Sequence, residues 1–124
     1  MKKTLIPITL VAILLALILT GCGKKAGESY GEPIQNRQIM NLKQVLTEPD
    51  SFKDKTLTVE GKIVRLCPTG CWFDIQNETA VVHVDIHPSG FVIPQKSGKT
   101  VLVEGTVSVI DGQVEIIGTG VEFQ

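Results

Sequence analysis

Two cysteines separated by three residues are the side chains in this sequence best suited to sulfur chemistry. Cys67 and Cys71 flank Pro68-Thr69-Gly70, in which proline fixes φ for a turn and glycine accepts the left-handed conformation of a three-residue hairpin loop. Residues that oppose each other on paired strands lie about 4.5 to 5.5 Å apart at Cα, a separation that a disulfide tolerates. The spacing therefore predicts two sulfur atoms that face each other across the neck of a hairpin.

Three uses of this cysteine pair stay open. The sulfur atoms form a disulfide, or they remain inert or redox-active thiols, or they bind a metal ion. For metal binding, His87 is the nearest histidine, and two thiolates with one imidazole favour Zn(II) or Cu(I) over hard cations. Alternation places Cys67 and Cys71 on the inner side and His87 on the outer side. This site therefore requires a twisted strand end or a bulge at Gly70.

A second group of polar side chains alternates along one predicted strand. His83, Asp85 and His87 lie two residues apart and therefore share one face. The two histidines are about 13 Å apart on a regular strand, so Asp85 with either of them is the better metal pair. Trp72 is expected on the same outer face, where it could stack on a ring of a ligand. We predict a ligand site at Trp72, His83 and Asp85, with ordinary solvated or packed surface residues as the alternative.

Motifs that would indicate catalysis do not combine into a reactive centre. The sequence has no phosphate-binding glycine loop and no zincin helix, and no nucleophile has an evident base beside it. We therefore expect that the protein is not an enzyme.

Apolar residues alternate along the chain after Lys55, which predicts five strands. Asp111-Gly112, between the last two strands, is one of the strongest short signals for a hairpin turn. Arg65 breaks the alternation near the end of the first strand, where a bulge or a snorkelling side chain would explain it. The predicted strands cover roughly residues 57–63, 71–76, 80–86, 100–110 and 113–123.

The register of the second and third strands follows from their apolar residues. A tight turn at Asn77-Glu78 pairs Phe73 with Val82, and the apolar sets of both strands then meet on one side. The same register places Trp72 opposite His83.

One short helix and one long loop complete the predicted fold. Asn41 is a candidate N-cap for a helix over residues 41–46, which Glu48-Pro49 ends. Residues 87–98 are broken by proline and glycine and predict a loop with one helical turn. Five strands with the longer connection between the third and fourth match the OB-fold, a small Greek-key barrel. We predict an all-β, OB-fold-like barrel over residues 39–124, with an open sheet or small sandwich as the alternative.

The amino terminus has the layout of a bacterial lipoprotein precursor. Met1-Lys2-Lys3 precedes an apolar run over residues 5–19, and Leu19-Thr20-Gly21-Cys22 resembles the lipobox. The run is shorter than the about 20 residues of a spanning helix. An unmodified cysteine and a retained helix are the alternatives. We predict a signal peptide over residues 1–21, acylation of Cys22, and a lipid-anchored flexible tether over residues 22–38.

Export and charge limit the partners of the mature protein. Loss of Lys2 and Lys3 leaves 10 of the 12 basic residues against 13 acidic residues, a net charge near −3. Such a chain offers no basic surface for a phosphate backbone, so we do not expect nucleic acid as a partner. Acyl chains such as palmitate would hold the domain on the outer side of the cytoplasmic membrane or in the outer membrane. The expected partners are the membrane, an envelope protein and a small ligand.

Several segments of the predicted domain carry a family resemblance. They are Val45-Leu46 with Pro49, Phe52 and Lys55, Leu57-Thr-Val-Glu-Gly61, Cys67-Pro-Thr-Gly-Cys71-Trp72, Phe91 with Pro94, and Val101-Leu-Val-Glu-Gly105. Together they resemble the exported tRNA-anti-like OB-fold lipoproteins, over about residues 40 to 123. The resemblance implies an OB barrel and a link to nucleic acids that is inherited from the name of the fold. It implies no settled activity.

The favoured hypothesis for function is a membrane-anchored, non-enzymatic binding module of the cell envelope for a small ligand, a metal or a protein. The first alternative is an OB domain that binds single-stranded nucleic acid or oligosaccharide. Few aromatic residues and the short turn at Asp111-Gly112 disfavour it. The second alternative is a thiol-based metal-handling or redox protein that uses Cys67 and Cys71.

Overall fold

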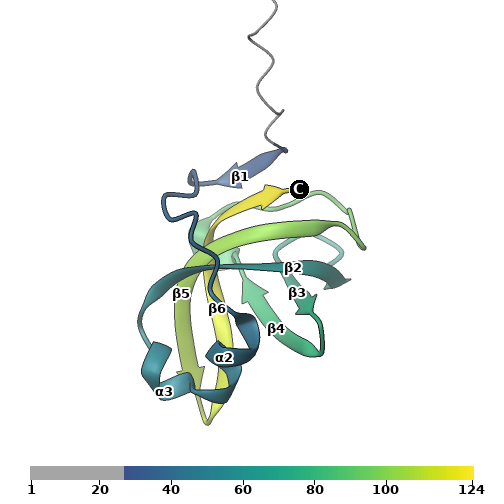
Figure 1. The fold of residues 1–124 in the computed structure, drawn as a ribbon. Coiled ribbons are helices and arrows are strands. Elements are labelled where there is room, and N and C mark those ends of the chain that lie inside the picture. Colours follow the sequence, from purple (N-terminus) through teal and green to yellow (C-terminus); the bar gives the residue numbers. More distant parts are fainter. Residues whose placement is uncertain (1–26) are drawn as a thin grey trace, which may run out of the picture.

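The computed structural model of the protein describes residues 27–124 (Figure 1). The predicted signal peptide and the predicted lipidation site, Cys22, lie outside the described residues. Across residues 27–124, none of the helices has the length and apolar character needed to cross a membrane.

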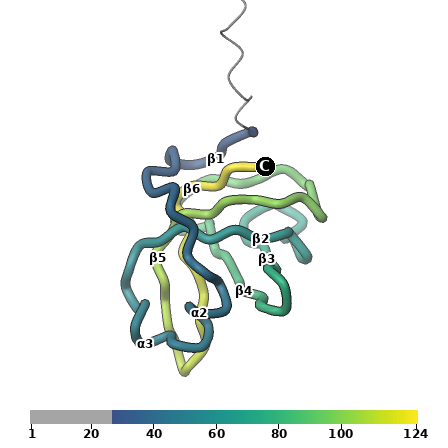
Figure 2. Tube along the Cα trace, in the orientation of Figure 1, coloured from purple at the N-terminus to yellow at the C-terminus, as the bar shows by residue number. Residues whose placement is uncertain are grey.

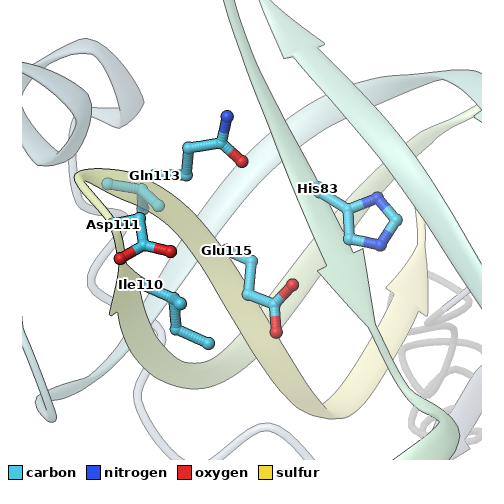
Figure 3. A pocket seen from close by; sticks show the side chains of 6 residues that line it. His83, Ile110, Asp111, Gln113 and Glu115 are labelled. Carbon is cyan, nitrogen blue, oxygen red and sulfur yellow. The ribbon is translucent and has the colours of Figure 1, made fainter.

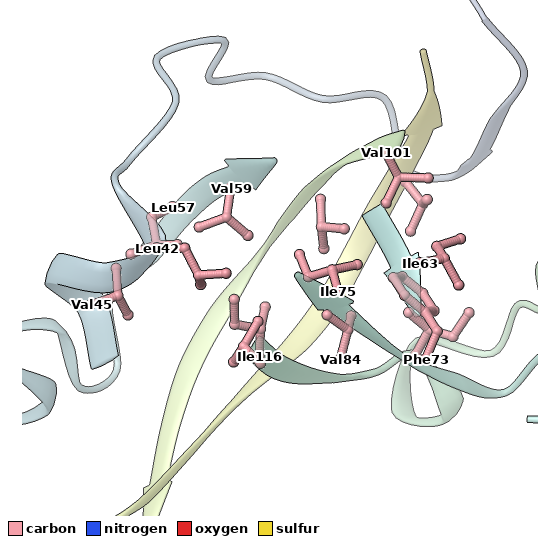
Figure 4. Close-up of a cluster of buried hydrophobic side chains, with 14 of the residues drawn as sticks. Leu42, Val45, Leu57, Val59, Ile63, Phe73, Ile75, Val84, Val101 and Ile116 are labelled. Atoms are coloured by element: carbon pink, nitrogen blue, oxygen red, sulfur yellow. The ribbon is translucent and has the colours of Figure 1, made fainter. Parts of the chain in front are cut away.

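Two short helices precede the barrel. α2 (Leu42–Thr47) begins where the sequence predicts, because the Asn41 side chain accepts a hydrogen bond from the Gln44 backbone N–H at 3.2 Å. α3 (Pro49–Phe52) follows directly, with proline in its first turn. The buried side chains of α2 belong to the same apolar cluster as the strands (Figure 4). The helix therefore packs on the barrel core.

The barrel consists of β2 (Thr56–Leu66), β3 (Trp72–Asn77), β4 (Ala80–Asp85), β5 (Thr100–Ile110) and β6 (Gln113–Phe123). β2 pairs with β3, β3 with β4, β4 with β6, β6 with β5, and β5 returns to β2 (Figure 1). All of these pairs are antiparallel except β4 and β6, which run parallel. This closed order is the strand plan of an OB-fold, and the predicted all-β barrel is confirmed.

The interior of the barrel is apolar. The inward-facing apolar side chains of each strand are buried, and most polar residues take outer positions (Figure 4). Burial of one such side chain stabilises the fold by about 1.5–3 kcal/mol. The largest fully buried side chains are Phe73, Ile63, Ile75, Ile86 and Ile116.

The β3–β4 hairpin has a register two residues away from the predicted one. Its turn lies at Glu78-Thr79 and not at Asn77-Glu78. Side chains alternate with a period of two, so this shift leaves every residue on its predicted face. The predicted pairing of Trp72 with His83 is wrong, because Trp72 pairs with Asp85.

A bulge interrupts β2 near its end. The register against β3 shifts between Ile63 and Arg65, and Arg65 pairs with Asp74. One of the two explanations for the broken alternation at Arg65, a bulge, is thus confirmed.

The first described residues form a strap (residues 27–40) on the outside of the barrel (Figure 2). β1 (Ser29–Gly31) pairs antiparallel with the end of β6, and Ile39 forms an isolated bridge with Thr58 of β2. The sequence predicts a flexible tether over residues 22–38, but residues 27–38 are ordered on the barrel. The difference arises because the strap backbone finds hydrogen-bond partners on strands and buried side chains.

Two buried carboxylates hold the strap, each only 7% exposed. Glu104 of β5 accepts hydrogen bonds from the backbone N–H groups of Gln35 and Asn36, the latter at 2.7 Å. The Arg37 guanidinium donates two hydrogen bonds to Glu122 of β6, at 2.9 and 2.7 Å. This pairing lowers the pKa of the Glu122 carboxyl. The strap thus covers acidic positions that would otherwise face solvent.

Replacing Gly112 by Val is expected to lower the free energy of unfolding by about 1 kcal/mol or more. Gly112 has φ 75° and Asp111 has φ 51°, the pair of left-handed residues that a type I′ turn requires. A steric clash does not cause this loss of stability, because a Cβ at Gly112 would meet no atom within 4 Å. Chemical denaturation measures the loss. Gly112→Asn, which tolerates positive φ, should lose less, and equal stability of both variants would contradict this account.

Candidate functional site

A row of polar side chains crosses the outer face of the barrel. Arg65 of β2 pairs with Asp74 of β3, Asp74 with His83 of β4, and His83 with Glu115 of β6. The Asp74 carboxylate contacts both neighbours, with Oδ1 2.7 Å from His83 Nδ1 and Oδ2 3.5 Å from Arg65 Nη1. Asp74 is buried, so its carboxylate holds both neighbouring side chains in place. The contact through Nδ1 fixes the orientation of the imidazole.

Trp72 lies on the same face, between a cation and an imidazole. Its ring centroid is 5.2 Å from the His83 centroid, with the two planes tilted by 42°. The guanidinium carbon of Arg65 lies 5.5 Å from the Trp72 ring centroid, within cation–π range. The structure therefore brings Trp72 and His83 together, as diagonal neighbours and not as direct partners.

An open cleft begins at His83, between β4 and the β5–β6 hairpin (Figure 3). Its volume is about 470 Å³. Two carboxylates, one imidazole, one amide and two aliphatic side chains line it, so the cleft combines negative charge with apolar contact. Ile110, near the hairpin tip, is 63% exposed. The lining residues are His83, Ile110, Asp111, Gln113, Val114 and Glu115.

Asp85 makes a local contact instead of joining this cleft. Its Oδ1 accepts a hydrogen bond from the backbone N–H of His87 at 3.0 Å, where β4 passes into the 3-10 helix η1 (His87–Ser89). Of the three predicted ligand residues, Trp72 and His83 therefore share one cluster, and Asp85 caps a turn.

Cys67 and Cys71 face each other across the β2–β3 connection, as the spacing predicts. Both are free thiols, with their Sγ atoms 2.9 Å apart. Thr69 Oγ1 lies 3.2 Å from Cys67 Sγ and 3.4 Å from Cys71 Sγ. Hydrogen bonds lower the pKa of Cys67 to about 6, and the one from Cys71 has a larger effect than the one from Thr69. The pair therefore favours a thiolate near neutral pH.

The predicted three-ligand metal site is not assembled. Within residues 27–124, no three His, Cys, Asp or Glu side chains gather closely enough to hold one ion. Cys67 is buried beside Cys71, whereas His87 is exposed in η1. Cys67, Cys71 and His87 thus do not form a joint Zn(II) or Cu(I) site in this structure.

One short motif that is typical of hydrolases has a structural role in this fold. Gly27-Glu28-Ser29-Tyr30-Gly31 matches Gly-x-Ser-x-Gly, which in hydrolases places a serine on a strand-to-helix turn. Here Ser29 lies in a strand and pairs with Glu122. The motif therefore builds the strap and does not form a nucleophile elbow.

Sequence reasoning missed Asp74 and most of the cleft. Asp74 lies between Phe73 and Ile75, so alternation alone could have placed it on the outer face next to Arg65. The cleft residues of the β5–β6 hairpin meet His83 only because β4 and β6 pair in parallel. The predicted OB-fold implies this pairing, but the spacing of residues within single strands does not show which side chains it brings together.

Closure of the strands and the polar outer face define the class of this protein, a small OB-like β-barrel. Comparison with protein-family models gives no match, and comparison with curated proteins gives none. Among solved structures, the hypothetical protein YgiW from E. coli is similar, with a TM-score of 0.52 and 19% sequence identity. The match covers 77% of this chain and 97% of that chain. At this identity the likeness supports the fold alone.

Proposed function

We propose that this chain is a lipid-anchored protein of the bacterial cell envelope whose barrel is a non-enzymatic binding module for an amine-bearing ligand. The observation that carries the proposal is the cleft beside His83, with Asp111 at the hairpin tip and Glu115 on β6 (Figure 3). A protonated amine can contact these carboxylates while its alkyl part lies on aliphatic side chains.

The charge of the cleft separates this function from the usual role of an OB groove. Asp111 and Glu115 would repel a phosphate backbone, and His83 and Arg65 are the basic groups nearest to them on the polar row. One tryptophan, already packed between two side chains, is also a small stacking platform for successive bases. Both features favour a cationic ligand over single-stranded nucleic acid.

Anchoring in the envelope rests on the sequence of the amino terminus. A charged start, an apolar run and the lipobox-like segment ending at Cys22 support export and acylation. The domain would then lie on the outer side of the cytoplasmic membrane or in the outer membrane, where small amines and basic segments of envelope proteins are available as partners.

Titration of the full chain in mild detergent with spermidine, a triamine, tests the cleft. Tripolyphosphate and an oligothymidylate serve as anionic comparisons, and the emission of Trp72, the single tryptophan, reports binding. We expect a response to spermidine alone, weakened about threefold to tenfold in Glu115→Gln because a carboxylate is lost. Glu60→Gln on β2, away from the cleft, is the matched control. A response to the oligothymidylate that is insensitive to Glu115→Gln would contradict the proposal.

A further inference from the structure

Cys67 and Cys71 are reactive groups that the proposed binding site does not use. Cys67 is 8% exposed and Cys71 is half-buried, so Cys71 is the more exposed residue of the pair. Their Sγ atoms are 2.9 Å apart, whereas the bond of a disulfide measures about 2.05 Å. Only a small movement of the side chains separates the dithiol from the disulfide.

The loop that carries the two sulfurs is held by hydrogen bonds that do not involve sulfur. Within it, Gly70 N–H donates to the Cys67 carbonyl at 2.8 Å, and Cys67 N–H donates to the Trp72 carbonyl at 3.0 Å. The β4–β5 connection adds Ile93 N–H to the Gly70 carbonyl at 3.1 Å, and Gln95 Nε2 to the Cys67 carbonyl at 2.9 Å. Because these four hydrogen bonds involve no sulfur atom, we expect the loop to keep them when the sulfurs bond.

A bond between these sulfurs would also contribute little to the stability of the whole barrel. It would close a loop of only five residues, from Cys67 to Cys71, and the entropic effect of a disulfide grows with the length of the closed loop. Partly exposed disulfides that the fold does not require are the ones that thiols reduce readily.

We infer that Cys67 and Cys71 form a redox-active pair that exchanges reversibly with external disulfides, with Cys71 reacting first. Cys71 gives its proton to solvent and attacks one sulfur of a disulfide R–S–S–R, which gives a mixed disulfide and releases one R–S⁻. Cys67, as a thiolate, then attacks Cys71 Sγ, forms the Cys67–Cys71 bond and expels the second R–S⁻. The pair loses two electrons and two protons, and the external disulfide gains both and becomes two thiols.

The surroundings of Cys67 support its role in the second step. In the dithiol, hydrogen bonds from Cys71 and Thr69 lower the pKa of Cys67 to about 6. In the mixed disulfide Cys71 has no S–H to donate, but the Thr69 hydroxyl, 3.2 Å from Cys67 Sγ, can still donate a hydrogen bond to the Cys67 thiolate. Ring closure should therefore slow as the pH falls and Cys67 becomes protonated.

The experiment uses the full chain with Cys22→Ser in mild detergent, so that Cys67 and Cys71 are the remaining thiols. Buffers of oxidised and reduced glutathione set the redox poise, and alkylation with mass spectrometry counts free thiols. We expect the disulfide to form and to be reduced again with unchanged circular dichroism. The emission of Trp72, which follows Cys71 in the chain, should change in parallel.

Single-cysteine variants test the order of the two steps. Cys67→Ser should accumulate a stable mixed disulfide of Cys71 with glutathione, because the attacking thiolate of the second step is missing. Cys71→Ser should react with oxidised glutathione at least about tenfold more slowly, since Cys67 is buried. A mixed disulfide that forms as fast on Cys67 would overturn the assignment of Cys71 as the first sulfur to react.

Thr69→Val is the variant that tests the hydroxyl beside both sulfurs. It should raise the pH midpoint of ring closure, because a hydrogen bond to the Cys67 thiolate is lost, whereas Thr79→Val, in the exposed β3–β4 turn, should leave the midpoint unchanged. Two results with the unvaried pair would overturn the inference, even where a variant fails to fold. They are the absence of a disulfide at every glutathione ratio, and a disulfide that thiols reduce only when the barrel unfolds.

Discussion

Replacing Cys22 by Ser is expected to abolish the lipidation of the protein, which is read out as labelling with palmitate. Acylation at a lipobox begins with a thioether, and serine has no sulfur to form it. One acyl chain binds membranes only marginally, whereas two or more hold a protein stably, so loss of the modified cysteine removes the anchor altogether. Cell fractionation with metabolic palmitate labelling should show an uncleaved precursor or a soluble exported form.

The other two cysteines provide the matched control for this experiment. Cys67→Ser and Cys71→Ser remove sulfur from the β2–β3 connection of the barrel and should leave both membrane attachment and labelling unchanged. A Cys22→Ser protein that still partitioned with membranes and still took up palmitate would rule out Cys22 as the anchor.

Replacing Glu104 by Ala is expected to lower the free energy of unfolding by about 2–3 kcal/mol and to detach the strap. Glu104 is 7% exposed and accepts the N–H groups of Gln35 and Asn36, and its carboxylate also lies 3.5 Å from Thr58 Oγ1. Alanine would remove the acceptor of the Gln35 and Asn36 N–H groups, whereas the Thr58 hydroxyl would keep the Asn36 carbonyl as its acceptor. Chemical denaturation measures the stability, and hydrogen exchange of the amides of Gln35 and Asn36 reports the strap.

Two further variants serve as controls for Glu104→Ala. Glu104→Gln keeps an acceptor oxygen and should lose less stability than Glu104→Ala. Glu60→Ala on β2, which removes a half-buried carboxylate without such partners, should change stability by less than about 0.5 kcal/mol. Two results together would mean that Glu104 does not hold the strap. The strap amides of Glu104→Ala would remain protected from exchange, and Glu104→Ala would be as stable as Glu60→Ala.

The barrel could be predicted from the sequence because its main signals are local. The predicted bounds of β5 and β6 are correct, because the Asp111-Gly112 turn sets the register of the residues next to it. Further along the hairpin, the register shifts between Glu104 and Gly105. The sequence determines the register of the β3–β4 hairpin less well. Turns at Asn77-Glu78 and Glu78-Thr79 both bring the apolar residues to one face, so the hydrophobic pattern does not distinguish them.

The strap could not be predicted, because it carries no apolar period of its own. Ile34 is its one buried apolar side chain. The other contacts of the strap include backbone hydrogen bonds, the packing of Tyr30 on Phe123, and the ion pairs of Glu28 with Lys96 and of Arg37 with Glu122. Such partners lie far away in the sequence. Nothing in a single sequence ties them together.

The candidate site was predicted only in part for a similar reason. Alternation was enough to place Trp72 and His83 on one outer face, and the structure keeps them there. Glu115 joins them through the parallel pairing of β4 and β6, which is a contact between strands that are not consecutive. The contact between Cys67 and Cys71, by contrast, could be predicted because both sulfurs belong to one short loop.

Under the proposed acylation of Cys22, the strap would limit the distance between the barrel and the lipid bilayer. Five peptide links join Cys22 to Gly27, where the described chain begins, and they span at most about 18 Å. A free tether to residue 38 would span up to about 58 Å. A barrel acylated at Cys22 would therefore stay within a shallow layer over the headgroups. The β5–β6 hairpin tip lies at the end of the barrel away from β1 (Figure 1), so the cleft would open toward the aqueous compartment and collect water-borne ligands.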